Sequence, residues 1–124
     1  MAELIYKEES YRIIGKCFEV HKHLGGGFSE VVYKDALEYE FEQDPIEYAR
    51  NKIYPVHYKG ILLPHTFEAD FVVFNKIILV VKGVKELTDE DVSRTLNYLA
   101  VSKNRLGLLV NFARGKLVHK RLVM

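Results

Sequence analysis

Residues 66–84 read TFEADFVVFNKIILVVKGV and contain two strands around which the rest of the chain must fold. The first, 66–74, is rich in aromatic and β-branched residues, and the second, 77–84, holds the unbroken apolar run IILVV. A run that does not alternate predicts a strand that is covered on both faces. The polar residues Asn75 and Lys76 predict a short hairpin between the two strands. We therefore expect the second strand to lie in the middle of a sheet.

Two helices are expected before this hairpin and one after it. Apolar residues recur at spacings of three and four over 4–24 and again over 28–43, and three glycines separate these segments. The first apolar stripe consists of Ile14, Cys17, Phe18, His21 and Leu24. Thr88 precedes three acidic residues, which predicts the start of a helix that runs to about Ser102, because a hydroxyl caps free N–H groups and acids favour the positive helix end.

The remaining segments predict three more strands. Residues 46–57 mix β-branched and aromatic types around Pro55, which is typical of an edge strand. The apolar stretch 106–112 and the segment that runs through Val123 predict the last two strands. The resulting order, ααβββαββ, calls for an α/β or α+β architecture with a mixed sheet flanked by helices. We expect residues 1–124 to form a single domain.

Composition excludes several classes of protein. The 124 residues carry 18 Lys and Arg against 17 Asp and Glu, so the net charge of +1 excludes a polybasic nucleic-acid-coating protein. The single cysteine, Cys17, cannot form an internal disulfide, which favours a reducing compartment. No segment approaches the roughly 18 apolar residues of a membrane span, and the N-terminal stretch is too acidic for a signal peptide. We expect a cytoplasmic protein without membrane association.

Four polar residues stand where the pattern predicts buried apolar ones: Glu30, Asp70, Lys82 and His21. A buried charge is unfavourable unless it is paired or binds a metal ion. Glu30 shares a helix face with Tyr33, although the helix dipole also favours an acid at this position. His21 near the three glycines is more typical of a hydrogen-bonded interior histidine than of a ligand.

The hairpin turn decides whether Asp70 and Lys82 belong to one site. A three-residue turn over 74–76 would place Asp70 opposite Val80 and diagonal to Lys82 on the same face. A two-residue turn would send Asp70 to the other face. The alternative to a functional site is a buried ion pair between Asp70 and Lys82.

Several motifs recur in an order that is typical of a known family. Gly27, Glu30 and Tyr33 spell GxxExxY, preceded by VHKHLGGG and followed by YKDALEYEF. The later ADFVV, the strand of Lys82 and the stretch LNYLAVSKNRLGLLVNF fit the same pattern. From about Ile13 to its end the chain resembles the GxxExxY proteins, a bacterial and archaeal family in the PD-(D/E)XK nuclease superfamily. The resemblance implies a restriction-endonuclease-like core that hydrolyses phosphodiesters of DNA.

The resemblance also implies a set of site residues. Asp70 would bind the metal, Lys82 would be the catalytic lysine, and Glu30 would be a helix carboxylate near the metal, which is Mg²⁺ or Mn²⁺ if the protein is active. Two positions depart from the family pattern. The Glu of Glu-x-Lys falls on Val80, which has no oxygen to offer a metal, and Arg94 stands where the family usually has Gln.

One interpretation of these departures is a nuclease-fold protein with an impaired metal site and no cofactor. Its fold would be retained as a module that binds nucleic acid or a protein partner. Lys82 and Arg94 would then neutralise Glu30 and Asp70, because two cations and two anions balance without a metal.

The alternative is an active Mg²⁺- or Mn²⁺-dependent DNA nuclease in which another acid replaces the missing ligand. Glu68, which shares strand parity with Asp70, is the better candidate, and Glu86 is the other. DNA is the expected substrate under this alternative, whereas the first interpretation leaves the partner open between nucleic acid and a protein. A run of aromatic residues near the edge strand would permit a homodimer: Tyr48, Tyr54 and Tyr58.

Overall fold

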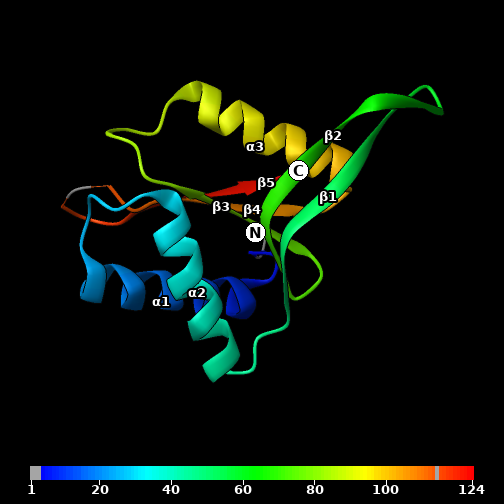
Figure 1. The fold of residues 1–124 in the computed structure, drawn as a ribbon. Coiled ribbons are helices and arrows are strands. Elements are labelled where there is room, and N and C mark those ends of the chain that lie inside the picture. Colours follow the sequence, from blue (N-terminus) through cyan, green and yellow to red (C-terminus); the bar gives the residue numbers. More distant parts are fainter. Residues whose placement is uncertain (1–3, 114) are drawn as a thin grey trace.

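The chain forms three helices and five strands in a computed structural model that describes residues 4–113 and 115–124. In chain order they are α1 (Lys7–Leu24), α2 (Glu30–Gln43), β1 (Tyr48–Tyr58), β2 (Ile61–Val73), β3 (Ile77–Lys82), α3 (Asp89–Ser102), β4 (Leu106–Asn111) and β5 (Val118–Val123) (Figure 1). This order confirms the prediction ααβββαββ and an α+β fold. No helix within the described ranges is long and apolar enough to cross a membrane.

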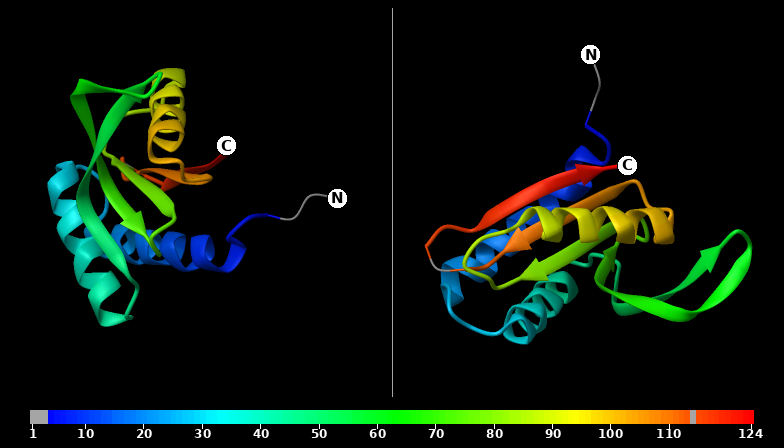
Figure 2. Two further views of the ribbon diagram at one scale, coloured as in Figure 1. Left: turned by 90° about the vertical axis from the view of Figure 1, so that its right-hand side faces the viewer. Right: turned by 90° about the horizontal axis from the view of Figure 1, so that it is seen from above.

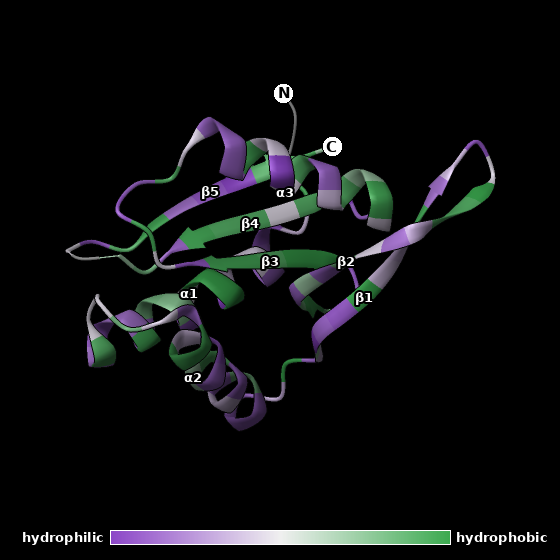
Figure 3. Cartoon of the chain, turned by 45° about the horizontal axis from the view of Figure 1, so that its top comes forward, coloured by the Kyte–Doolittle hydropathy of each residue, from purple (hydrophilic) through white to green (hydrophobic). Residues whose placement is uncertain are grey.

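The strands form one mixed sheet in the order β1-β2-β3-β4-β5. β3 and β4 run parallel, while the other neighbours are antiparallel. The parallel pair needs a crossover connection, and α3 lies in it. β3 is central and its residues 77–81 are buried, as the run IILVV predicted. In Figure 3, β3 and β4 are strongly hydrophobic, whereas β1 and β5 carry hydrophilic residues.

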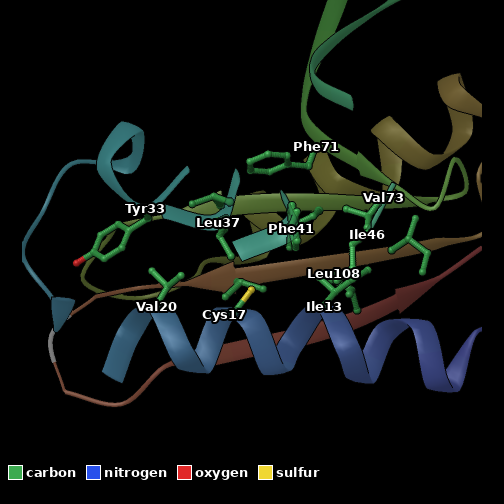
Figure 4. Close-up of a cluster of buried hydrophobic side chains, with 14 of the residues drawn as sticks. Ile13, Cys17, Val20, Tyr33, Leu37, Phe41, Ile46, Phe71, Val73 and Leu108 are labelled. Atoms are coloured by element: carbon green, nitrogen blue, oxygen red, sulfur yellow. The ribbon is translucent and has the colours of Figure 1, made fainter. Parts of the chain in front are cut away.

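The helices cover opposite faces of the sheet (Figure 2). α1 and α2 pack on one face above the larger cluster of buried side chains, part of which is drawn in Figure 4. The aromatic members of this cluster are Tyr33, Phe41, Phe71 and Phe112. α3 packs on the other face above a smaller cluster that consists of Ala69, Val72, Ile78, Val80, Leu99 and Leu109.

The buried stripe of α1 differs from the predicted one. The residues that α1 buries are Ser10, Ile13, Cys17 and Val20. Phe18, which the sequence placed inside, is 49% exposed. Two apolar stripes share Cys17 and lie side by side on this helix, and the choice between them depends on the angle at which α1 meets the sheet.

Two hairpins determine where a site can form. Val73 pairs with Ile77, so the turn has three residues, 74–76, which decides between the two alternatives left open by the sequence. The pairing of β2 with β3 ends at Phe71 and Leu79. The β1–β2 hairpin extends well beyond that point and curves past α3 (Figures 1 and 2). β1 is the edge strand that the sequence predicted. β2 and β3 therefore diverge at Asp70.

Candidate functional site

A cavity of about 160 Å³ lies where β2 leaves β3, between the start of α2 and the start of α3. Six of the residues singled out from the sequence line it: Glu30, Glu68, Asp70, Val80, Lys82 and Arg94. Asp91, Thr95 and Tyr98 of α3 also contribute to its wall. The cavity thus brings together side chains from both sides of the central hairpin and from two helices.

Asp70 occupies the point of divergence and both its carboxylate oxygens accept hydrogen bonds. Oδ2 accepts the backbone N–H of Val81 at 2.8 Å, and Oδ1 accepts from the Lys34 ammonium at 3.2 Å. The carboxylate takes the hydrogen bond that a β2 carbonyl would accept if the ladder continued beyond Phe71. Asp70 and Lys82 line one cavity but do not form the ion pair considered from the sequence, since the described salt bridge of Asp70 is with Lys34.

Lys34 is a site residue that the sequence reasoning missed. It projects from α2, its side chain is 11% exposed, and its Nζ also donates to Asn51 Oδ1 at 2.6 Å. A signal was present, because Lys34 lies three and seven residues before Leu37 and Phe41 and so belongs to their buried helix stripe. Glu30, one turn earlier on this helix, was among the predicted site residues, but Lys34 was not.

Lys82 faces a second missed residue, Asp91. Lys82 Nζ lies 3.7 Å from Asp91 Oδ1, while Asp91 Oδ2 accepts from the Thr88 backbone N–H and hydroxyl at 2.9 and 3.2 Å. The Thr88 N–H, its hydroxyl and the Lys82 ammonium hold the pKa of Asp91 below its usual value. These bonds complete the capping box of α3 and confirm the predicted cap at Thr88.

The expected pairing of Lys82 and Arg94 with Glu30 and Asp70 is therefore wrong. Arg94 Nη2 lies 3.0 Å from Glu90 Oε1, one turn earlier on α3, in an exposed pair. Both cations pair with acids of α3, because α3 brings its own first-turn carboxylates closer to them than α2 or β2 does.

Glu30 begins α2 and connects it to the end of β3. Its Oε2 accepts the backbone N–H of Gly83 at 3.0 Å, next to Lys82 in the chain. Glu68, the preferred replacement acid of the sequence prediction, lines the cavity, whereas Glu86 is absent from the described lining. Val80 is 7% exposed and packs in the cluster beneath α3.

Tyr33 and His21 lie away from this cavity, at the glycine-rich connection between α1 and α2. Figure 4 shows Tyr33 at the edge of the buried cluster. The Tyr33 hydroxyl donates to the Gly25 carbonyl at 2.6 Å and accepts the Phe28 N–H at 3.2 Å, and its ring stacks on Phe112. His21 Nε2 lies 3.4 Å from the carbonyl oxygen of Ala113. Both residues hold this connection against the end of β4 and do not reach the charged groups.

The donor set of the cavity does not fit a divalent cation. Mg²⁺ needs several oxygen ligands that converge in near-octahedral geometry. Val80 offers none, both oxygens of Asp70 are engaged, and one oxygen of Asp91 caps a helix. Within residues 4–113 and 115–124, no three acidic, histidine or cysteine side chains are placed to hold one ion together.

Comparison with known proteins shows a family and a likeness of fold. A family model described as the PD-(D/E)XK nuclease superfamily matches residues 7–122. A solved structure titled "Crystal structure of SSO0001" aligns with a TM-score of 0.59 and 14% sequence identity, over 74% of this chain and 49% of that one. The chain thus spans about half the length of that protein, and at this identity the likeness concerns the fold alone. No curated protein matches significantly.

Proposed function

The chain belongs to the PD-(D/E)XK nuclease superfamily, and from this premise we propose that it is a GxxExxY-type member whose fold binds nucleic acid without hydrolysing it. Gly27, Glu30 and Tyr33 carry the motif of that family. The proposal rests mainly on the position of Val80. It lies two residues before Lys82 on the same strand and borders the same cavity. A branched alkyl group there supplies no lone pair where the superfamily pattern requires a carboxylate.

Aromatic rings beside the cavity support a role in binding nucleic acid. Tyr54 stacks on Phe67 and Phe67 stacks on Tyr98, with centroids 5.0 and 4.7 Å apart and ring planes 12° and 4° from parallel. Tyr98 lines the cavity together with Lys82 and Arg94. Aromatic rings next to cationic side chains are the usual means by which proteins bind single strands, since bases stack and phosphates pair.

The test compares cleavage and binding in one preparation. Supercoiled and single-stranded DNA are incubated in Mn²⁺ with the natural protein, with Val80→Glu and with the neutral control Val80→Gln. We expect cleavage by Val80→Glu alone. The proposal fails if the natural protein cuts and Asp70→Ala abolishes that cutting.

Fluorescence anisotropy of a labelled single strand tests the binding role. We expect Tyr98→Leu to weaken binding by at least about fivefold, from the roughly 1 kcal/mol or more that one stacked base contributes. Tyr39→Leu on the exposed surface of α2 is the matched control and should leave affinity unchanged. If the natural protein binds no DNA, the binding proposal is wrong and a protein partner becomes the better explanation of the retained fold.

One observation favours a second candidate, an active DNA nuclease with a relocated acid. Asp91 Oδ1 lies beside Lys82 Nζ, and Glu68 lines the same cavity, so either could stand in for the missing ligand next to Asp70 and Glu30. In the same assay this candidate requires cutting by the natural protein that Asp91→Asn or Glu68→Gln removes.

We also propose that the protein works in the cytoplasm, since a lone, fully buried Cys17 fits a reducing compartment. A homodimer through the β1–β2 hairpin stays a prediction. Of its three tyrosines, Tyr58 is exposed, Tyr54 belongs to the aromatic stack, and the Tyr48 hydroxyl donates to carboxylates of α2.

A further inference from the structure

The Lys34 ammonium is inserted between two side-chain oxygens on neighbouring strands. It contacts Asn51 Oδ1 on β1 and Asp70 Oδ1 on β2. The pairs on either side, Arg50 with Phe71 and Lys52 with Ala69, place Asn51 and Asp70 opposite each other in the ladder. Asn51 has a left-handed backbone, with φ of 55°. The ammonium thus sits where the hairpin turns away from the sheet.

This environment suits a positive charge. A nearly buried lysine is unfavourable unless strong acceptors replace its hydration, and here a carboxylate and an amide oxygen do so. Carboxylate and amide oxygens are also the ligands that hard metal cations prefer. The two cations that line the cavity pair with other acids, Lys82 with Asp91 and Arg94 with Glu90, so Lys34 approaches Asp70 from outside the cavity lining.

We propose that Lys34 is the built-in cation of this site, whose ammonium group supplies to Asp70 the positive charge that a bound metal would otherwise supply. The inference rests on the proposed function, because it concerns the same cavity and explains how Asp70 is stable there without a metal. It makes a claim that the proposed function does not make: the charge of Lys34 weakens the binding of divalent cations at Asp70, and removing that charge turns the oxygens of Asp70 and Asn51 into a weak metal site.

A purely structural ion pair would behave differently. If Lys34 only held α2 to the hairpin, its loss would lower stability equally with and without divalent cations. If it is the cation of the site, Mn²⁺ restores part of the lost stability and does so through Asp70. Binding of the metal alone therefore separates the two roles.

The variant that tests this is Lys34→Met, which keeps the unbranched side chain and removes the charge. Mn²⁺ binding is measured by titration calorimetry and by loss of the free-ion electron paramagnetic resonance signal, alongside thermal melting with and without Mn²⁺. Lys16→Met is the matched control, because Lys16 is a partly buried lysine of α1 that pairs with Asp44 and Glu40, away from the cavity.

We expect Lys34→Met to bind Mn²⁺ at least about fivefold more tightly than the natural protein or Lys16→Met, the factor for one unit charge at about 4 Å in water. The gain should disappear in Lys34→Met/Asp70→Asn and increase in Lys34→Met/Val80→Glu. Equal Mn²⁺ affinity of the natural protein and Lys34→Met would overturn the inference.

The two roles of Lys34 can be distinguished even if Lys34→Met fails to fold without metal. If Lys34→Met folds only when Mn²⁺ is present, the inference is supported. If it stays unfolded in Mn²⁺ while Lys34→Met/Asp70→Asn folds, Lys34 is a structural partner of Asp70 and the inference is wrong. Cleavage is scored separately: a natural protein that cuts DNA contradicts the proposed function, whereas an inactive natural protein with a metal-indifferent Lys34→Met contradicts this inference alone.

Discussion

The two faces of the sheet differ in what they bury, although the same strands build both. Along β3, Leu79 and Val81 point toward α1 and α2 into the larger apolar cluster, while Ile78 and Val80 belong to the smaller cluster beneath α3. Lys82 extends that second face and meets Asp91 of α3. The face beneath α1 and α2 is closed by apolar side chains, whereas the face beneath α3 opens into a charged cavity.

β2 explains the difference, because it changes face at Asp70. Phe71 and Val73 lie in the cluster beneath α1 and α2, but Phe67 and Ala69 pack beneath α3. Strict alternation would keep these four odd-numbered residues on one face. The strand therefore twists at the residue that lines the cavity. Because the apolar cluster beneath α1 and α2 stabilises the sheet, the face beneath α3 can carry polar groups near Asp70, where β2 twists.

The largest expected effect compares two phenylalanines of β2. Phe71→Ala should lower the free energy of unfolding by about 3–5 kcal/mol, since it leaves a void in the closed face. Phe67→Ala, on the partly buried aromatic stack, should lower the free energy of unfolding by about 1–2 kcal/mol. Urea denaturation measures both. Equal losses would show that the two faces contribute alike and would contradict the comparison.

An intermediate effect is expected at the glycine-rich connection. Tyr33→Phe keeps the ring stacked on Phe112 and removes the hydroxyl that joins the Gly25 carbonyl to the Phe28 N–H. The loss of these hydrogen bonds should cost about 1–1.5 kcal/mol in thermal unfolding and speed hydrogen exchange at the Phe28 amide. Tyr39→Phe on the exposed surface of α2 should change neither, and an unchanged Phe28 amide in Tyr33→Phe would refute the prediction.

The smallest effect concerns Asp91 on the open face and depends on pH. Its pKa is lower in the folded protein than the usual 3.8, mainly through the Thr88 N–H. The unfolded state therefore takes up a proton first, so this stabilisation is complete well above pH 4 and is lost as pH falls through the folded pKa.

Asp91→Asn should cost about 0.5–1 kcal/mol at neutral pH and flatten the fall in stability below pH 4. Melting curves from pH 2 to pH 7 measure this. Arg94→Ala breaks an exposed pair and is expected to cost less than about 0.5 kcal/mol without changing the pH profile. A variant Asp91→Asn with the natural pH profile would contradict the assigned cause.

Local pattern was sufficient for much of the fold. The run IILVV predicted a central strand because only a strand covered on both faces needs no polar side. The cap at Thr88 was predicted because it depends on neighbouring residues, whereas the sequence was compatible with a two- or a three-residue turn between β2 and β3 and the strand pairing decided between them. β2 starts at Ile61 rather than at Thr66, because pairing with β1 extends it beyond its apolar segment.

The candidate site was predictable in membership but not in its contacts. Glu30, Asp70 and Lys82 all line the cavity, as expected from polar residues in apolar patterns. The residues that pair with Asp70 and Lys82 were not predicted. These partners are Lys34 on α2 and Asp91 on α3. Which charged side chains pair depends on how closely the helices approach the diverging strands. The periodicity of the sequence gives the face of each residue but not this distance.

By itself the sequence determined the order of helices and strands, the central position of β3, the cap at Thr88, and the absence of a carboxylate at position 80. These follow from interactions between residues close in the chain and from which side chains can be buried. Only the tertiary structure decided that β2 twists at Asp70 and that Lys34 reaches its carboxylate. The contact of Lys34 with Asp70 joins residues 36 apart in the sequence, and a buried charge pairs with whichever partner the tertiary packing brings close to it.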